Sequence, residues 1–144
     1  MRILAVDLGE KRTGLAVSTP DELMALALPT LLDADAEAVA RAAKEQGAEL
    51  VVIGLPINMD GTAGPAAERA QEFARELQAL LSAPVATWDE RLSTAEGDSR
   101  MRAQGLSRKD RAKRADAAAA IVILEAFMAH RKKAEDRRKK KEER

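Results

Sequence analysis

The fold of this 144-residue chain is decided by residues 3–18, ILAVDLGEKRTGLAVS. Ile3 to Leu8 is an apolar run that Asp7 alone interrupts, which is typical of a central strand. A turn at residues 9–12 leads into a second apolar run at residues 13–18. Because no helix separates the two runs, we expect two antiparallel strands joined by a short turn.

Strands and helices follow one another outward from this hairpin. A third strand at residues 24–32, broken near Pro29, is expected to extend the antiparallel part. Apolar runs predict parallel strands at residues 50–53 and 84–88. Helices are expected at residues 36–46, from Pro65 onward, from Ser93 to about Gly105, and, fully buried, at residues 117–129. The sequence therefore predicts one α/β domain with a five-stranded mixed sheet, three antiparallel strands and then two parallel ones, and helices on both faces.

Charge is unevenly distributed along a chain whose net charge is zero. Residues 131–144 contain nine Lys or Arg against four Asp or Glu, so this tail carries +5 and the rest of the chain −5. A second basic cluster, residues 108–114, has five basic residues and one acidic residue. Two basic patches favour a polyanionic partner, although a solvated helix end explains the tail equally well. We expect a domain at residues 1–130 and a basic tail at 131–144, partly helical or frayed.

The composition excludes several kinds of chemistry. The chain has no cysteine, which removes disulfides, thiolate nucleophiles and thiolate-bound zinc. Its single histidine, His130, lies beside the charged tail, where a solvated side chain is expected. No apolar run approaches the roughly 18 residues of a membrane span, so we expect a cytoplasmic protein without a membrane partner. For an enzyme, carboxylates and a hard metal ion are the main remaining option.

Three acidic residues are candidates for such a metal site. Asp7 lies within an apolar strand, where an unpaired charge is costly unless a cation or hydrogen-bond donors offset it. Glu90 directly follows the strand expected at residues 84–88, at a carboxyl end where ligands gather in parallel sheets. Its neighbour Asp89 is expected to point the other way, and spacing alone leaves the choice between the two open. Asp116 opens the last helix; a helix cap would explain it, but the basic cluster just before it favours a phosphate-binding site.

Four segments, in order along the chain, resemble those of a known family. They are AVDLG with TGLAV (residues 5–9 and 13–17), VVIGLPINMDGT (51–62), DERLST (89–94) and DAAAAI (116–121). Through them the chain is similar, from Met1 to about Met128, to the YqgF/RuvX family of ribosomal RNA precursor nucleases, which are related to Holliday junction resolvases. The resemblance implies a ribonuclease H-like fold and a hydrolase that cleaves phosphodiester bonds, with the 16S ribosomal RNA precursor as the expected substrate. It says nothing about the tail after His130.

The resemblance also implies that Asp7, Glu90 and Asp116 are the catalytic residues and the metal ligands. Mg²⁺ is the expected ion because it prefers oxygen ligands, Mn²⁺ would substitute, and two ions are expected. The loop at residues 54–62 is implied to border the site, although ordinary turn chemistry explains its sequence equally well. The expected substrate-binding residues are Lys11, Arg12, Asn58, Arg91, Arg108, Lys109, Arg111, Lys113 and Arg114.

Two other functions stay open beside the processing of precursor RNA. Holliday junction resolvases carry two acids one helical turn apart on the last helix, whereas Ala119 lies three residues after Asp116, which weakens the case for cleavage of branched DNA. A non-catalytic nucleic-acid-binding or ribosome-associated module would need only the fold. Because aromatic residues make up 2% of the chain, recognition is expected to depend on backbone and shape. Ribosomal particles are a candidate partner, and a homodimer would suit a junction-cleaving enzyme.

Overall fold

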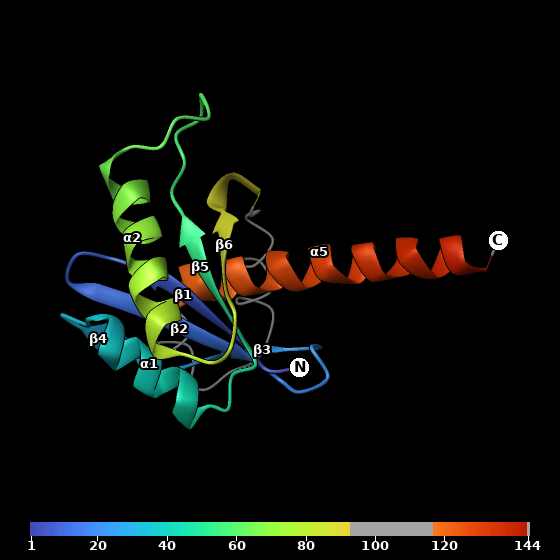
Figure 1. Ribbon diagram of the computed structural model, residues 1–144, viewed down its shortest axis with the longest axis horizontal. Coiled ribbons are helices and arrows are strands. Elements are labelled where there is room, and N and C mark those ends of the chain that lie inside the picture. Colours follow the sequence, from blue (N-terminus) through green and yellow to red (C-terminus); the bar gives the residue numbers. More distant parts are fainter. Residues whose placement is uncertain (93–116, 144) are drawn as a thin grey trace.

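A mixed sheet forms the centre of the computed structural model, which describes residues 1–92 and 117–143 (Figure 1). Its strands are β1 (Ile3–Leu8), β2 (Arg12–Ser18), β3 (Ala25–Ala27), β4 (Leu31–Leu32), β5 (Leu50–Leu55) and β6 (Val85–Asp89). They lie in the order β3-β2-β1-β5-β6, and β4 also pairs with β2. β2 is antiparallel to β1, β3 and β4, whereas β5 is parallel to both β1 and β6. The expected division into an antiparallel and a parallel part is confirmed.

The turn between β1 and β2 requires glycine. Gly9 follows β1, and a Cβ atom at this position would collide with the backbone carbonyl oxygen of Arg12, the first residue of β2. A residue without a side chain therefore lets the chain reverse direction in very little space. The pairing that follows sets Asp7 opposite Gly14.

Three α-helices and one short 3-10 helix complete the described part of the fold. They are α1 (Ala36–Glu45), α2 (Pro65–Leu80), η1 (Glu90–Leu92) and α5 (Ala118–Glu142). The Asp35 carboxylate caps α1 by accepting a hydrogen bond of 2.9 Å from the backbone N–H of Ala38. Pro65 begins α2, where its missing N–H costs no helical hydrogen bond. None of the described helices is both long enough and apolar enough to cross a bilayer.

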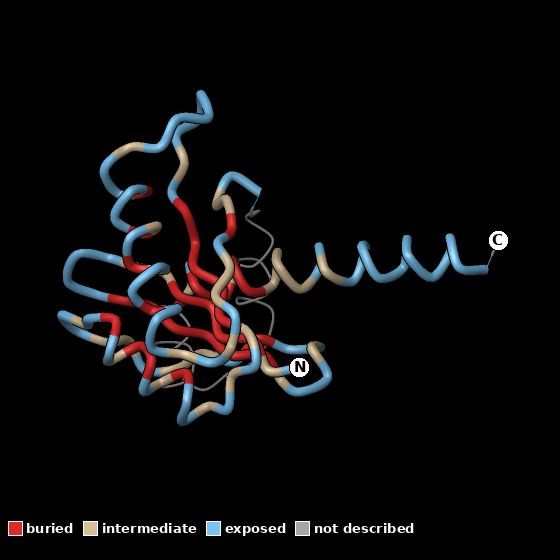
Figure 2. The backbone as a smooth tube through the Cα atoms, in the orientation of Figure 1, coloured by how far each residue is buried: buried red, intermediate tan, exposed pale blue. Residues whose placement is uncertain are grey.

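Alternating side chains along the strands divide the core into two layers. On β1, Leu4 and Val6 belong to the layer that contains residues of α1 and α2, whereas Ile3 and Ala5 belong to the layer that contains residues of α5. Helices thus cover both faces of the sheet, as expected, with α1 and α2 on one face and α5 on the other (Figure 1). Figure 2 shows the buried residues concentrated in the sheet and in the parts of the helices that pack on it.

The third strand is divided into β3 and β4, at the break that was expected near Pro29. Pro29 lies between these two strands and has no N–H for the ladder with β2, so the sheet has six strands where five were expected. At the other end of the chain, α5 runs without interruption to Glu142, so the boundary expected at residue 130 falls inside a helix. The helix expected from Ser93 to about Gly105 lies outside the described residues.

Candidate active site

Asp7 is a half-buried residue near the end of β1. Ile3 and Ala5 face the layer beneath α5, and the alternation of side chains places Asp7 on this same face. The position is held from both sides, because β1 pairs with β2 and with β5. Asp7 therefore presents its carboxylate at the carboxyl ends of parallel strands, where ligands gather in such sheets.

Glu90 is brought to the same region by β6. Trp88, near the end of β6, is buried in the layer beneath α5, and Glu90 follows two residues later in η1, where it is half-buried. β6 is parallel to β5, which in turn is parallel to β1. The two acids therefore lie at the same edge of the sheet, as the sequence analysis expected of them.

Gly54 lies between the two acids, because β5 is the strand between β1 and β6. A Cβ atom at Gly54 would lie 3.1 Å from both Cγ and Cδ of Glu90, and 2.6 Å from Cδ1 of Ile123 on α5. The Glu90 side chain therefore passes closely over Gly54, on the strand that separates it from Asp7. Any larger residue at position 54 would fill this space. Glycine at position 54 therefore lets the carboxyl groups of Asp7 and Glu90 approach each other.

The sequence alone did not predict that Gly54 makes room for the Glu90 side chain. The sequence places this glycine at the start of the loop at residues 54–62, whereas the structure places it inside β5, where it is buried. A usable signal was present in the apolar run LVVIGL, in which the glycine is the one residue without a side chain. Glycine weakens a strand, so its presence inside one indicates a close approach by another group.

The two carboxyl groups have shifted acidities. Burial raises the pKa of Asp7 above its ordinary value. Burial also raises the pKa of Glu90, and the negative charges of Asp7 and Asp89 raise it further. Both shifts mean that the ionised carboxylates of Asp7 and Glu90 are less stable at this site than they would be in water. A hard divalent cation with oxygen ligands would relieve the repulsion and the desolvation together, so these residues fit Mg²⁺ or Mn²⁺.

The third expected ligand, Asp116, lies outside the described residues. It directly precedes Ala117, which is buried against the sheet at the start of α5. Within residues 1–92 and 117–143, no group of three or more histidine, cysteine or acidic residues could hold a metal ion. The described part of the chain therefore contributes two of the three expected ligands.

Asp89, the alternative to Glu90, is engaged in local hydrogen bonds. Its carboxylate accepts one bond from the backbone N–H of Arg91 at 2.9 Å and another from the Arg91 guanidinium at 2.7 Å. These bonds from Arg91 lower the pKa of Asp89, whereas the pKa of Glu90 is raised. The contacts favour Glu90 as the metal ligand. They also mean that Arg91, an expected phosphate contact, is held in an ion pair with Asp89.

Where the structure describes them, the other expected substrate-binding residues lie in the segments that follow β1 and β5. Lys11 and Arg12 are exposed at the turn between β1 and β2. Asn58 is exposed after β5, and its amide donates a hydrogen bond of 3.1 Å to the Thr62 hydroxyl within the same loop. Arg108, Lys109, Arg111, Lys113 and Arg114 lie outside the described residues. The structure therefore brings Asp7 and Glu90 together, whereas Lys11 and Arg12 lie in a different segment from Asn58.

The raised pKa values predict how the stability of the metal-free protein depends on pH. The folded state binds protons on Asp7 and Glu90 more tightly than the unfolded chain does, so their ionisation destabilises the fold, and this penalty disappears as the pH falls through the raised pKa values. In EDTA, Asp7→Asn is therefore expected to have a higher Tm than the unmodified chain at about pH 8 and an equal Tm at about pH 4.

Thermal unfolding of the variant and the unmodified chain at each pH measures this difference. A comparison is needed because the lowered pKa values of other carboxyl groups, those of Asp21, Asp60 and Asp89 among them, shift the stability of both proteins in the opposite direction. If Asp7→Asn melted at a lower temperature than the unmodified chain at every pH, the Asp7 carboxylate would be stabilising the fold, and the interpretation of the raised pKa would be wrong.

Comparisons with known proteins identify the family of this chain. The RuvX family model, described as Holliday junction resolvase, matches residues 1–130. The chain belongs to the RuvX family. A relative from Anaeromyxobacter sp. (strain K), named "Putative pre-16S rRNA nuclease", is 45% identical over 137 residues, which cover 91% of this chain and 98% of the relative. A RuvX relative of the same name from Syntrophomonas wolfei is 43% identical over 132 residues, which cover 89% of this chain and 94% of the relative.

Solved structures of Holliday junction resolvases resemble this RuvX chain in fold. Thermus thermophilus RuvC in complex with a Holliday junction substrate has a TM-score of 0.56 at 15% identity, over 90% of this chain and 95% of that chain. The fowlpox virus Holliday junction resolvase has a TM-score of 0.57 at 17% identity, over 90% of this chain and 99% of that chain. At such identities the likeness concerns the fold alone, and the expected ribonuclease H-like fold is confirmed.

Proposed function

We propose that this RuvX-family chain is a metal-dependent nuclease that hydrolyses phosphodiester bonds in the precursor of 16S ribosomal RNA. The observation that carries the proposal is the convergence of Asp7 and Glu90 across Gly54, at the carboxyl ends of parallel strands. Burial raises the pKa values of both acids, and the negative charge of Asp7 raises that of Glu90 further, which is the condition that a divalent cation relieves. The name shared by the relatives supports the RNA substrate.

The mechanism assigns a separate task to each part of the site. Asp7, Glu90 and Asp116 would together hold two divalent ions. Bound Mg²⁺ or Mn²⁺ would supply an activated water and stabilise the leaving 3′-oxygen of an in-line displacement. β1 and β6 hold the Asp7 and Glu90 side chains in place before substrate binds, so little entropy is lost in orienting them. The cations of residues 108–114, with Lys11 and Arg12, would hold the phosphates that flank the reacting bond.

Cleavage of branched DNA is the second candidate function. The description of the RuvX family model as Holliday junction resolvase favours it. Against it stands Ala119, which is an exposed residue of α5 at the position where the junction resolvases carry a further acid. Three carboxylates without that fourth acid agree better with a site for RNA processing, so we place RNA first.

Cleavage is expected to require Mg²⁺ or Mn²⁺ and to disappear in EDTA. The chain has no cysteine, and its one histidine, His130, is exposed with its ring against Trp88 at a centroid distance of 5.4 Å. The chain therefore has no cysteine thiolate that could act as an alternative nucleophile. Ca²⁺ is expected to bind but to support little turnover, because its looser coordination places the attacking water poorly.

A cleavage panel measures this dependence on metal and on substrate. Structured precursor RNA, single-stranded RNA, single-stranded DNA and a four-way DNA junction are each incubated with Mg²⁺, Mn²⁺, Ca²⁺ or EDTA. Asp7→Asn, purified in the same way, controls for contaminating nucleases. Preferential cleavage of the junction would favour the second candidate, and binding of RNA without cleavage under any ion would indicate a non-catalytic module. Cleavage in EDTA that is absent from the Asp7→Asn preparation would exclude the metal mechanism.

A further inference from the structure

The last part of α5 extends beyond the body of the protein as an arm, which we define as residues 131–143. Every residue from 132 to 143 is exposed, and Figures 1 and 2 show this part of the helix projecting away from the sheet. The RuvX family model ends at residue 130, so family membership does not describe the arm. Its function has to be inferred from its own residues.

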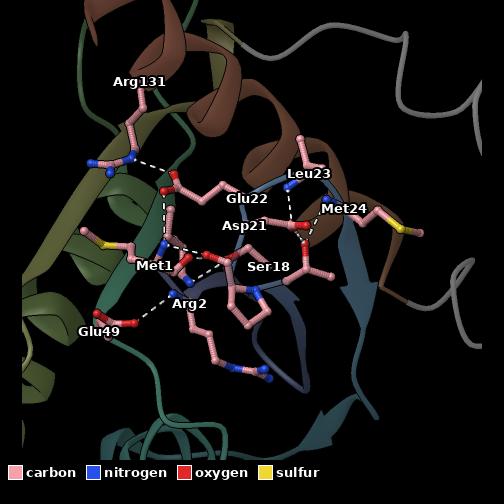
Figure 3. A network of polar contacts seen from close by, with 12 residues as sticks. Met1, Arg2, Ser18, Asp21, Glu22, Leu23, Met24, Glu49 and Arg131 are labelled. Carbon is pink, nitrogen blue, oxygen red and sulfur yellow. Dashed lines mark hydrogen bonds and ion pairs between the residues drawn. The ribbon is translucent and has the colours of Figure 1, made fainter.

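The arm leaves the body at Arg131, which is fixed in place. Its guanidinium forms an ion pair with Glu22 at 3.0 Å, and the amine of Met1 reaches the same carboxylate at 3.2 Å (Figure 3). Burial of Glu22 opposes its ionisation, but the hydrogen bonds from Arg131 and the Met1 amine hold its pKa below the ordinary value. Because Arg131 is engaged, the cations of the arm that can serve a partner begin at Lys132.

The charges of the arm are sorted onto different faces of the helix. At 3.6 residues per turn, positions separated by four, seven or eight residues share a face. Four cations follow this spacing and form what we call the basic stripe: Lys133, Arg137, Lys140 and Lys141. The acids of the arm lie on another side of the helix: Glu135, Asp136, Glu142 and Glu143. The basic stripe therefore has no acidic residue within its arc of about 100°.

The basic stripe continues the outward face of α5. Eighteen residues, or five turns, before Arg137, and so on the same face, lies Ala119, which is exposed. The acidic side continues the inward face instead, because the buried Leu124 lies eleven residues before Glu135. A partner can thus reach the stripe from the side of the helix that faces away from the sheet.

We propose that the basic stripe binds the phosphate backbone of a double-helical RNA segment beside the cleavage site. The proposal rests on the proposed nuclease function, which supplies the polyanion. Among the ion pairs of the described residues, none includes a member of the stripe, so its cations are available for phosphates. Lys133 and Lys141 are separated by about 12 Å along the helix, which corresponds to about three to four phosphates of one strand.

Other partners fit the arm less well. Ala134 is the one uncharged residue of the arm, so the arm has no apolar face that could enter a membrane interface or pack against a second helix. Exposed cations attract phosphates by a force that depends steeply on salt and carries no information about base sequence. The arm would therefore increase the affinity for RNA and orient the RNA, while the site on the sheet would select the phosphodiester bond to be cleaved.

Two triple variants of the full chain with the same net charge test the proposal. The stripe variant carries Lys133→Gln, Arg137→Gln and Lys140→Gln. The control variant carries Lys132→Gln, Arg138→Gln and Lys139→Gln, which lie on the other faces of the arm. Both lose three positive charges, and glutamine keeps the helix propensity, which circular dichroism verifies. Affinity for a hairpin RNA with a long duplex stem is measured in EDTA at about 50 to 200 mM salt.

The stripe variant is expected to bind at least about tenfold more weakly, and its slope of log Kobs against log salt is expected to be smaller in magnitude by about two to three. The control variant should change the slope by less than about one. Equal losses in both variants, or no loss in either, would overturn the proposal. The proposal would also be overturned by a stripe variant that binds RNA as tightly as the unmodified chain but no longer sediments with anionic vesicles.

Failure of this test can be told apart from failure of the proposed function. Cleavage of RNA by the unmodified chain with Mg²⁺ or Mn²⁺ decides the function, whereas the difference between the two triple variants decides the role of the stripe. Cleavage without that difference would leave a nuclease whose arm is merely solvated. A difference in binding without cleavage would leave an RNA-binding protein, and the stripe would then not serve a cleavage site.

Discussion

Cleavage is expected to fall by about 10³-fold or more when Asp7 is replaced by Asn. Asp7→Asn keeps the shape of the side chain while it removes the charge, so the variant loses a metal ligand and the transition-state stabilisation that a bound divalent ion provides. Glu90→Gln and Asp116→Asn are expected to have the same effect on kcat, measured with Mg²⁺ at saturating structured RNA. Near-normal turnover by Asp7→Asn would contradict the central claim of the proposed function.

Asp89→Asn is the matched control for these substitutions. Asp89 forms an ion pair with Arg91 at 2.7 Å, so Asp89→Asn should keep most of the activity. If Asp89→Asn were inactive and Glu90→Gln active, Asp89 and not Glu90 would be the metal ligand. Asp116→Asn also separates a metal ligand from a helix cap, since Asn caps a helix about as well as Asp does. The double variant of Asp7 and Asp116 should be no less active than either single variant, because members of one catalytic unit act non-additively.

The second large effect is expected at Gly54, a residue with no reactive group. Gly54→Ala would place a Cβ atom 3.1 Å from Cγ and Cδ of Glu90, so the Glu90 side chain has to move. Because small displacements of a catalytic group have large effects on rate, we expect kcat with Mg²⁺ to fall about 10- to 100-fold. The fold should tolerate the methyl group at a cost of about 1–3 kcal/mol, measured by chemical unfolding.

A second substitution shows which contact causes the loss of activity. The new Cβ atom would also lie 2.6 Å from Cδ1 of Ile123, and Ile123→Val removes that atom. Alone, Ile123→Val should cost about 0.5–1.5 kcal/mol of stability and keep the activity. Combined with Gly54→Ala, it should recover stability but not kcat, because the contact with Glu90 persists. If the double variant regained normal kcat, the strain on α5 and not the position of Glu90 would be the cause.

The paired central strands could be predicted from residues 3–18 because the pattern there is local. An apolar run, a short turn and a second apolar run suffice to predict β1 and β2, which the structure confirms. In the same way, Pro29 predicts the break between β3 and β4, since a residue without an N–H cannot donate a hydrogen bond to the neighbouring strand. The continuation of α5 to Glu142 was predicted only in part, because the composition of its charged end suits a helical and a frayed tail equally well.

The candidate site could be predicted only in part. Asp7 was recognisable because a charge inside an apolar run is costly wherever the strand lies. The choice between Asp89 and Glu90 depended on a contact with Arg91 that spacing does not reveal. The role of Gly54 follows from the lateral order of β1, β5 and β6 and from Ile123 on a distant helix, and such contacts between remote segments cannot be obtained from local sequence.

The place of α5 in the chain has a consequence for biosynthesis. Among the described helices, α5 alone covers the face of the sheet that bears Asp7, and it is the last to be translated. Until α5 has been made, the apolar side chains of Ile3, Val52 and Trp88 lack the helix that packs on them, and such a surface invites aggregation or chaperone binding. A chain cut short before residue 118 would therefore lack the helix that closes this layer of the core. Folding of the sheet face that bears Asp7 thus has to wait until α5 has left the ribosome.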